Sequence, residues 1–378
     1  MNFDRDALPP MDVAGRLGRL RDALAADAAT SGTDALLVGH LTNVRYLTGF
    51  TGSAALLLVT PTDTVFVTDG RYKDRAAAEL DAAGVTATIE VVNDAEATVV
   101  EHVARLGLGA LGLEADTVTW SAQRRLSDAL ATDGGGCSAV PTVAVVETLR
   151  LTKDAGEVAR IRAAAAIADR ALDTVRHRLL DGLTESEFAA ELDATMRGLG
   201  ADDLSFETIV ASGPNGARPH HTPSDRTIAQ GDLVVVDFGA LVDGYHSDMT
   251  RTLGVGALDE ERRHMLDVVL DAQAAGVAAV TAGVDCATVD KACRDLIDEA
   301  GMGDAFLHST GHGVGLDIHE EPRVSARSTA TLRPGHVVTV EPGVYLTGIG
   351  GVRIEDTVLV TEDGCERLTL ATKDPMVV

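Results

Sequence analysis

Aromatic residues and paired cysteines are both scarce in this chain of 378 residues. Only 3% of the residues are aromatic, so the interior has to be packed mainly with alanine, valine, leucine and glycine. The four cysteines include no CxxC pair, which argues against a zinc ribbon or a disulfide framework and predicts free thiols in a reducing compartment. Cys286 and Cys293 are expected to be small core residues on one helix.

Positive charge is scarce as well. The chain has 58 acidic and 32 basic residues, a formal net charge of −26, and only four of the basic residues are lysine. This balance excludes nucleic acids and anionic membranes as partners, because both would be repelled. An acidic, lysine-poor surface is typical of halophilic proteins, whose salt-rich cytoplasm screens the self-repulsion. A GC-rich genome that favours alanine and arginine codons is the alternative explanation.

Long apolar runs are also missing. No stretch approaches the roughly 20 apolar residues of a membrane span, and residues 1–12 lack the charged-then-apolar pattern of a secretion signal. We therefore expect a soluble, cytoplasmic protein. The hydrophobic share of 45% is enough to build sizeable cores in a chain long enough for two domains.

The first part of the chain has the pattern of an α/β domain. Between residues 34 and 143, short apolar runs alternate with amphipathic helical segments. The expected strands are 35–38, 54–59, 64–68, 86–92 and 111–114, and the expected helices include 72–83 and 122–131. Few polar residues cluster here, so the chemistry is expected in the second part.

A change of pattern near residue 150 divides the chain into expected domains at 1–150 and 151–378. The second domain opens on a long helix whose apolar stripe runs from Val158 to Leu179. Thr184 followed by Glu187 is the signature of a capping box that begins another helix. Two more helices are expected at 259–281 and 286–300, the latter capped by Asp285 and ended by Gly301.

One pattern occurs twice in the second domain. Gly231-Asp-Leu-Val-Val-Val-Asp237 aligns with Gly335-His-Val-Val-Thr-Val-Glu341, so each apolar strand reaches an acid six residues after its glycine. Each copy continues through a turn into a second strand that carries another acid. That acid lies in Asp248-Met-Thr in the first copy and in Glu355-Asp-Thr in the second.

The first copy allows its strand register to be worked out. Asp243-Gly244 is a natural two-residue hairpin turn. This turn places Asp237 opposite Thr250, and Asp248 becomes the diagonal neighbour of Asp237 on the same face of the sheet. The second copy has a longer, glycine-rich connection, which leaves its register open.

Carboxylates on apolar strands have to be neutralised, because an unpaired buried carboxylate is costly. Arginines such as Arg251 and Arg353 could neutralise the acids one by one. A shared pair of divalent cations explains better why four acids arise in two copies of one pattern. The sequence therefore predicts a two-metal site between two related hairpins.

Histidines gather between the two copies. His308, His312 and His319 fall within twelve residues that are interspersed with glycine, and His220-His221 follows another turn-rich loop. The other histidines are expected to be structural or to lie in ordinary helices and loops: His40, His102, His177, His246, His264 and His336. No HExxH, GxSxG or Walker A motif is present.

Three segments of the second domain resemble the pita-bread metallopeptidases, a family that includes aminopeptidase P, prolidase and methionine aminopeptidase. They are Val234–Thr252, Ser309–Glu321 and Val338–Val360. Thr42-Asn-Val-Arg-Tyr-Leu-Thr-Gly-Phe-Thr-Gly52 is similar to the creatinase-type N-terminal domain of the proline-specific branch. The resemblance implies an α+β chain, with a creatinase-like α/β domain followed by a pita-bread catalytic domain of curved antiparallel sheets backed by helices.

The resemblance also implies a ligand set. Asp237 would be bidentate to one metal, Asp248 and Glu355 would bridge both metals, and His312 and Glu341 would complete the shell of the other. The family favours manganese, whereas the oxygen and nitrogen ligands also suit Co²⁺ or Zn²⁺.

The remaining polar residues of the motif match the family's catalytic and supporting groups. His308, His319 and His220 correspond to catalytic and substrate-binding histidines, and Glu341 to the proton shuttle. His220 is preferred over His221 because it directly follows Pro219. Arg353 and Tyr345 resemble groups that steady Asp248, Glu355 and their neighbours.

The implied function is an Xaa-Pro aminopeptidase, which cleaves peptides with proline at the second position by means of a metal-bridging hydroxide. A prolidase restricted to Xaa-Pro dipeptides is the alternative. A metal-free creatinase-like hydrolase, a lyase of the same fold and a non-catalytic peptide-binding module are more remote, because their ligand sets would be incomplete. The resemblance further implies a homodimer.

Overall fold

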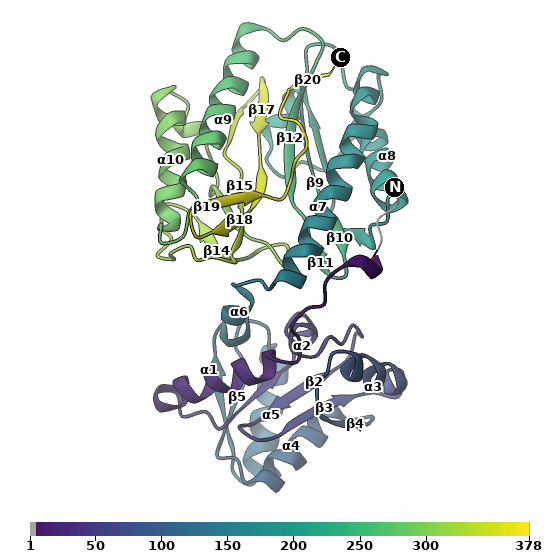
Figure 1. Cartoon of the computed structure of the whole chain (residues 1–378), viewed down its shortest axis with the longest axis vertical. Coiled ribbons are helices and arrows are strands. Elements are labelled where there is room, and N and C mark those ends of the chain that lie inside the picture. The colour runs from purple at the N-terminus through teal and green to yellow at the C-terminus, as the bar shows by residue number, and fades with distance from the viewer. Residues whose placement is uncertain (1–4, 378) are drawn as a thin grey trace. The chain divides into compact units, whose positions relative to one another are not determined.

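The computed structural model describes residues 5–377, which form two compact units (Figure 1). The first unit is Asp12–Arg150, and the second consists of residues 5–11 and 151–377. The expected first domain, 1–150, thus differs from this unit at its N-terminal end. Residues 5–11 include the short 3-10 helix η1 (Arg5–Ala7), and the Arg160 guanidinium donates a hydrogen bond to the Pro9 carbonyl at 2.9 Å.

The first unit is built on a six-stranded mixed sheet in the order β4-β3-β2-β1-β5-β6. All five predicted strands are present, as β1 (Ala35–Val38), β2 (Leu56–Val59), β3 (Thr64–Thr68), β4 (Thr88–Val91) and β5 (Ala110–Glu114). The sixth strand, β6 (Ser138–Thr142), was not predicted. It contains Pro141, which a strand tolerates at the edge of a sheet because the missing N–H is not needed there.

Four helices lie between successive strands: α2 (Leu41–Thr48), α3 (Lys73–Ala82), α4 (Ala95–Leu106) and α5 (Trp120–Thr132). In addition, α1 (Arg16–Ser31) precedes β1 and α6 (Val145–Arg150) follows β6. The predicted helices at 72–83 and 122–131 correspond to α3 and α5. Aliphatic side chains of the sheet, α4 and α5 form one buried core, in keeping with the low aromatic content.

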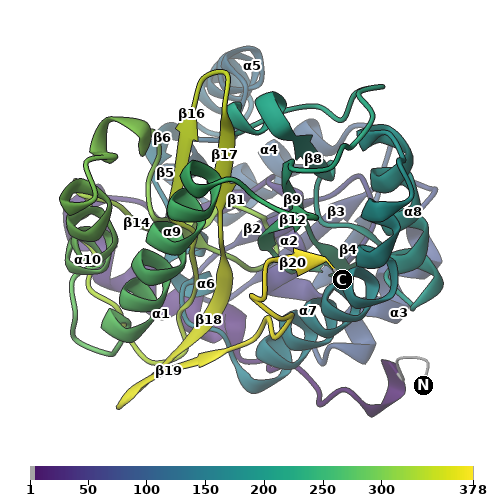
Figure 2. The same ribbon diagram turned by 90° about the horizontal axis from the view of Figure 1, so that it is seen from above.

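The second unit contains a four-stranded sheet and a five-stranded sheet, and each of them is covered by a pair of helices (Figure 2). The first sheet, β20-β12-β9-β8, packs against α7 (Ala155–Val175) and α8 (Glu185–Gly198). The second sheet, β14-β13-β15-β18-β19, packs against α9 (Glu260–Ala279) and α10 (Cys286–Glu299). The sequence repeat therefore corresponds to two similar layers of helices and strands.

The strands and short helices of this unit are as follows. The first layer contains β8 (Ile209–Ser212), η3 (Gly213–Ala217), β9 (Leu233–Phe238), β12 (Met249–Val255) and β20 (Met376–Val377), and α7 continues into η2 (Arg176–Leu180). A small sheet is formed by β7 (Asp203–Leu204), β10 (Ala240–Val242) and β11 (Tyr245–His246). The second layer contains η4 (Gly303–Ala305), β13 (Gly311–Gly313), β14 (Glu320–Val324), β15 (Val337–Val340), β18 (Asp356–Thr361) and β19 (Gly364–Arg367), with the hairpin β16 (Gly343–Leu346) and β17 (Gly350–Arg353).

The ends of the helices agree with the sequence signals in all but one case. The Thr184–Glu187 capping box at α8 is confirmed, with hydrogen bonds in both directions. Gly301 follows α10 with φ +75°, a conformation that suits glycine. The prediction that the Asp285 side chain caps α10 is wrong: Asp285 lies at the N-cap position, but its Oδ1 accepts a hydrogen bond from the Thr331 hydroxyl at 2.8 Å instead.

Two predictions concern the whole chain. Cys137, Cys286, Cys293 and Cys365 are all free thiols, and Cys286 and Cys293 are buried on α10 as expected. Within residues 5–377, every helix is too short or too polar to cross a membrane.

Candidate metal centre

The first pair of acids lies on β9 and at the start of β12. The turn at Asp243-Gly244 has positive φ angles of 49° and 76° and joins β10 to β11. The strands then pair so that Asp237 lies opposite Thr250, which confirms the predicted register. Asp248 directly precedes β12 and is buried.

The second pair of acids flanks β15 and β18 in the same manner. Val340 of β15 pairs with Asp356 of β18, so Glu341 and Glu355 are the next residues beyond this pair. Glu355 is 1% exposed. Both copies of the repeat therefore bring their acids to the facing ends of paired strands.

Two threonines of the repeat join the two layers, a role that was not predicted. The Glu355 N–H donates to the Thr250 carbonyl at 3.1 Å, and the Thr250 hydroxyl donates to Glu355 Oε2 at 2.8 Å. In return, the Thr357 hydroxyl donates to the Asp248 carbonyl at 2.7 Å. The signal was present in the sequence, because Asp248-Met-Thr and Glu355-Asp-Thr both place a threonine two residues after the acid.

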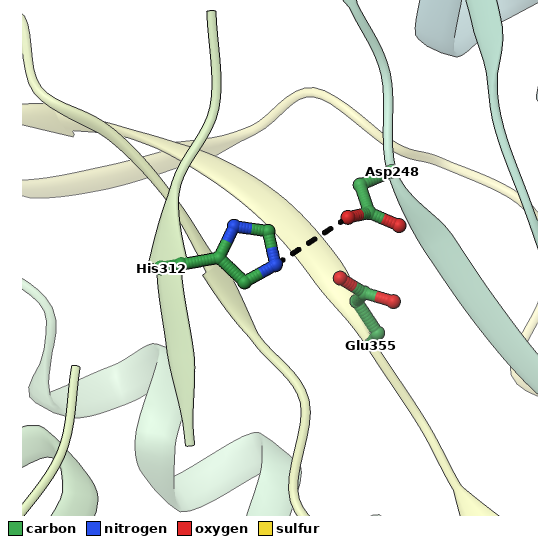
Figure 3. A group of neighbouring side chains, drawn as sticks. All are labelled: Asp248, His312 and Glu355. Atoms are coloured by element: carbon green, nitrogen blue, oxygen red, sulfur yellow. Dashed lines mark ion pairs between the residues drawn. The ribbon is translucent and has the colours of Figure 1, made fainter. Parts of the chain in front are cut away.

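His312 on β13 faces Asp248 and Glu355 (Figure 3). Its Nδ1 lies 3.0 Å from the Gly313 carbonyl, and because a carbonyl can only accept, Nδ1 carries the hydrogen. Nε2 is therefore the ring nitrogen that faces the acids, 3.5 Å from Asp248 Oδ2 and 3.3 Å from Glu341 Oε1. Ligand atoms of Asp248, His312 and Glu355 all lie within 4.8 Å of one another.

The cluster has more negative charge than its protein neighbours neutralise. Burial, reinforced by the neighbouring carboxylates, raises the pKa of Asp248 and of Glu355 well above their ordinary values. Asp237 Oδ1 and Glu355 Oε1 are buried, and neither has a hydrogen-bond partner among the described residues. Two buried carboxylate oxygens without a partner indicate that a positive charge belongs beside them, and a bound cation would supply it.

Arginines account for only one of the four acids. Arg353 Nη2 lies 2.6 Å from Asp237 Oδ2. Arg251 pairs instead with Asp356 at 2.9 Å. In the described part of the chain, the alternative explanation by one-to-one arginine pairing therefore leaves Asp248, Glu341 and Glu355 without an arginine partner. Carboxylate oxygens and an imidazole nitrogen in one buried cluster fit a divalent metal.

A cavity of about 530 Å³ opens onto this cluster. Its lining includes all five predicted ligands and all three predicted histidines: Asp237, Asp248, His312, Glu341, Glu355, His220, His308 and His319. The ring of His319 meets that of His312 edge to face, with centroids 4.4 Å apart. Burial and the neighbouring His312 lower the pKa of His319 to about 4, so its ring is neutral near pH 7.

Arg353, Tyr345 and His308 form a chain of hydrogen bonds beside the acids. Arg353 Nη1 donates to the Tyr345 hydroxyl at 2.7 Å, and that hydroxyl lies 2.8 Å from His308 Nε2. His308 Nδ1 donates to the Ser309 carbonyl at 2.8 Å. Arg353 was expected to steady Asp248, Glu355 and their neighbours; it contacts the neighbouring carboxylate of Asp237 directly and reaches Glu355 through the shared Thr250 hydroxyl.

His220 and His221 have different surroundings. His221 is 8% exposed, and its Nε2 lies 2.8 Å from Glu185 Oε2. His220 is exposed and lines the cavity. This arrangement makes His220 the better placed of the two to meet a substrate.

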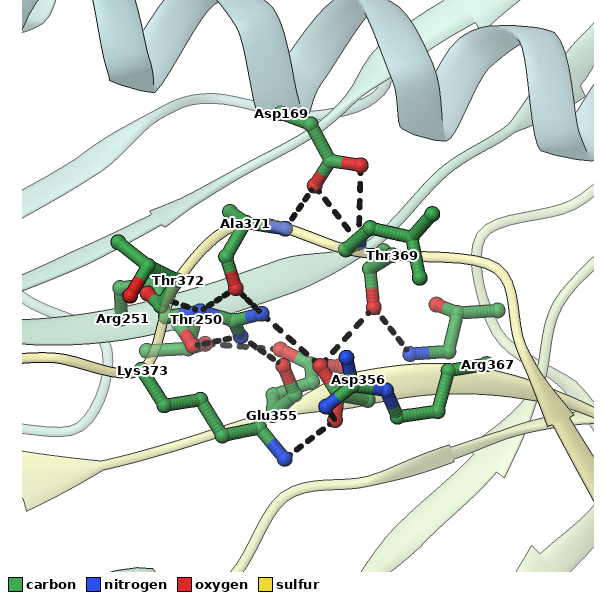
Figure 4. A network of polar contacts seen from close by, with 12 residues as sticks. Asp169, Thr250, Arg251, Glu355, Asp356, Arg367, Thr369, Ala371, Thr372 and Lys373 are labelled. Carbon is green, nitrogen blue, oxygen red and sulfur yellow. Dashed lines mark hydrogen bonds and ion pairs between the residues drawn. The ribbon is translucent and has the colours of Figure 1, made fainter.

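A buried ion-pair network lies behind Glu355 and involves the C-terminal segment (Figure 4). Asp356 is fully buried and accepts from Arg251 at 2.9 Å and from Lys373 at 2.6 Å. The Arg251 guanidinium also donates to the carbonyls of Glu355 and Ala371. The network thus attaches residues 371–373 to β18, which begins directly after Glu355.

Replacing Lys373 with methionine is expected to lower the free energy of unfolding by about 2 kcal/mol, because Asp356 loses a cation while it remains buried. The matched control is Lys291→Met. Lys291 pairs with Asp295 at 2.6 Å on the surface, where the two side chains are 71% and 51% exposed, and its loss should change stability by no more than about 0.5 kcal/mol. Urea unfolding of the three proteins measures this difference, and equal changes in the two variants would contradict it.

Comparisons with known proteins match both halves of the chain. Residues 159–362 match Metallopeptidase family M24, and residues 16–152 match the Creatinase/Prolidase N-terminal domain. An uncharacterized peptidase of Bacillus subtilis, YqhT, is 41% identical over 343 residues, which are 91% of this chain and 95% of that protein.

Two solved structures are similar over nearly their whole length. An Xaa-Pro dipeptidase from Bacillus anthracis is 38% identical with a TM-score of 0.90, and the match covers 95% of this chain and 99% of that one. An X-Pro aminopeptidase from Thermotoga maritima MSB8 is 35% identical with a TM-score of 0.83, and the match covers 93% and 99%.

Proposed function

The chain belongs to metallopeptidase family M24, and from this premise we propose that it removes the first residue from peptides with proline at the second position. The expected fold, a creatinase-type N-terminal domain followed by a pita-bread catalytic domain, is confirmed. The observation that carries the proposal is the buried cluster of Asp248, His312 and Glu355, which opens onto a cavity that Asp237 and Glu341 also line and that is large enough for a short peptide.

We infer that two divalent ions are held by five residues: Asp237, Asp248, His312, Glu341 and Glu355. Two observations support this assignment: Asp237 Oδ1 and Glu355 Oε1 have no hydrogen-bond partner among the described residues, and His312 Nε2 faces Asp248 and Glu341. Manganese is the proposed metal, and the same oxygen and nitrogen ligands suit Co²⁺ and Zn²⁺. When bound, such a pair supplies Lewis acidity and lowers the pKa of a water molecule.

The surrounding side chains bind the substrate and move its protons. Glu341 is proposed as the proton shuttle, with its Oε1 held by the Thr339 hydroxyl at 3.1 Å. Neutral His319 is proposed to donate an N–H to the carbonyl oxygen before proline, where negative charge develops. Both ring nitrogens of His308 are engaged by Ser309 and Tyr345, so His308 offers the substrate its ring edge rather than a free N–H.

Recognition of proline depends on shape, because the bond to be cleaved has no amide hydrogen to donate. Phe206 and Ile318 supply apolar surface in the cavity. Arg323 lies on the same lining. A guanidinium in this position suits a free carboxylate, which a dipeptide carries next to its proline ring. This observation favours the second candidate, an Xaa-Pro dipeptidase.

The test is hydrolysis of Ala-Pro, Ala-Pro-Ala-Ala and Ala-Ala-Ala-Ala after loading with Mn²⁺, Co²⁺ or Zn²⁺ in turn. An aminopeptidase cleaves the tetrapeptide with proline, a dipeptidase cleaves only Ala-Pro, and both leave the proline-free peptide intact. Equal cleavage of the proline-free peptide would overturn the proposed specificity. No cleavage with any of the metals would overturn the proposed function.

His319→Ala is expected to lower kcat by about a hundredfold, because a donor to the developing oxyanion is lost. The matched control is His264→Ala, on the exposed side of α9, which should leave kcat unchanged. Steady-state kinetics on Ala-Pro or the proline tetrapeptide measures both variants. A kcat for His319→Ala within about twofold of the parent would show that the histidine does not contribute to this charge stabilisation.

We further propose a homodimer in a salt-rich cytoplasm. The net charge of −26 and the four lysines support the halophilic interpretation. Light scattering tests the first point, with a dimer mass expected at high salt, and urea unfolding at low and high salt tests the second, with greater stability expected at high salt. A monomer under all conditions would contradict the dimer.

A further inference from the structure

Another buried carboxylate lies outside the candidate metal centre, at the first residue of α8. Glu185 is 0% exposed. Its Oε1 accepts hydrogen bonds from the backbone N–H and the hydroxyl of Ser212, both at 2.7 Å. Its Oε2 accepts from the backbone N–H of Ser224 at 3.1 Å and from its hydroxyl at 2.6 Å. One carboxylate thus holds both ends of the segment 212–224.

Capping of α8 does not explain this side chain. The cap of α8 is formed by Thr184 and Glu187, which bond to each other's backbone N–H groups. Burial opposes the charge on Glu185, but hydrogen bonds from Ser224, Ser212 and His221 outweigh it and lower the pKa of Glu185 to about 2. The group is therefore an anion at neutral pH whose donors come from the segment 212–224 rather than from its own helix.

The segment carries His220 between two fixed neighbours. On one side, the Pro219 carbonyl accepts a hydrogen bond from Arg353 Nη1 at 3.3 Å. On the other side, His221 Nε2 lies 2.8 Å from Glu185 Oε2. Asn215 Nδ2 also donates to Glu185, at 3.1 Å. The exposed ring of His220 thus projects into the cavity from a backbone held on both sides.

We propose that Glu185 is a positioning residue that fixes His220 in the cavity by holding the segment 212–224 from behind. The inference rests on the proposed function, because His220 matters only if substrate binds in this cavity. Glu185 itself is fully buried and acts through His221 and the two serines. A misplacement of about 1 Å in a substrate-contacting group can cost on the order of a hundredfold in rate, so such a support affects activity without contacting the substrate.

Glu185→Gln tests the proposal, with Glu187→Gln as the matched control. The glutamine keeps the shape, but its N–H₂ faces the serine and histidine donors and leaves at least one of them unpaired. The control removes a carboxylate from the same helical turn without touching the segment. Amide hydrogen exchange in residues 213–224 is expected to be at least about tenfold faster in Glu185→Gln than in the control. Equal exchange in the two variants overturns the proposal without any assay of activity.

A kinetic cycle then asks whether Glu185 acts through His220. In the parent, Glu185→Gln is expected to lower kcat/KM by on the order of tenfold to a hundredfold. In a His220→Ala background, the same change should cost less than about twofold, since the group that it positions is gone. The same loss in both backgrounds would show a general structural effect and overturn the proposal. If the parent cleaves no Xaa-Pro substrate, the proposed function fails, whereas the exchange experiment still decides the role of Glu185 in the segment.

Discussion

Replacing Asp248 with alanine is expected to lower kcat for Xaa-Pro hydrolysis by about a thousandfold or more, equivalent to roughly 4 kcal/mol of transition-state stabilisation. Asp248 is buried, faces His312 Nε2 at 3.5 Å and belongs to the cluster whose ligand atoms converge within 4.8 Å. Without this carboxylate, the cluster would lose one of the oxygens that are proposed to hold the divalent cations. The metal content of the purified variant should therefore fall together with its activity.

Asp267→Ala is the matched control, because Asp267 is an exposed acid on α9 in the same unit. It should retain the activity and the metal content of the parent. Inductively coupled plasma mass spectrometry and steady-state kinetics on the same preparations measure both quantities. Full activity and full metal content in Asp248→Ala would contradict the assignment of this cluster.

Relative to the Mn²⁺-loaded protein, the metal-free protein is expected to lose stability as the pH rises. Burial raises the pKa of Asp248 and Glu355 in the metal-free fold. An acid with a higher pKa in the folded chain binds its proton more tightly there than in the unfolded chain. The resulting stability is fully present below the ordinary pKa of about 4, and it is lost as the pH rises through the raised values.

Bound metal should oppose this loss, because the cations neutralise the carboxylates in the folded chain only. At a free metal concentration a thousandfold above Kd, the gain is about 4 kcal/mol. Urea unfolding between pH 5 and pH 8, with chelator or with Mn²⁺, measures the two slopes. Glu185 does not interfere, because its pKa of about 2 places its titration below this range. Identical stability with chelator and with metal would contradict the prediction.

The cluster of acidic side chains could be predicted because the sequence pattern that specifies it is local and occurs twice. Each acid lies a fixed number of residues from a glycine or a turn. Counting along the two strands from the turn predicted that Asp237 lies opposite Thr250. The same reasoning identified the helices from apolar spacing and the capping box at Thr184. These features depend on residues that are close together in the sequence.

The features that were missed depend on partners far apart in the chain. Asp285 bonds to Thr331, 46 residues away, instead of capping its own helix. Asp356 is held by Arg251, and the contact of Arg353 with Asp237 spans 116 residues. Glu185 meets serines that lie 27 and 39 residues further along the chain. No local pattern specifies such pairs, because they are set by how the layers pack.

The most direct test of the metal assignment is anomalous diffraction from crystals of the protein soaked in Mn²⁺. We expect two strong peaks inside the cavity, in contact with the side chains of the five proposed ligands: Asp237, Asp248, His312, Glu341 and Glu355. Peaks elsewhere, or a cavity without ions in which these acids face basic side chains, would contradict the assignment.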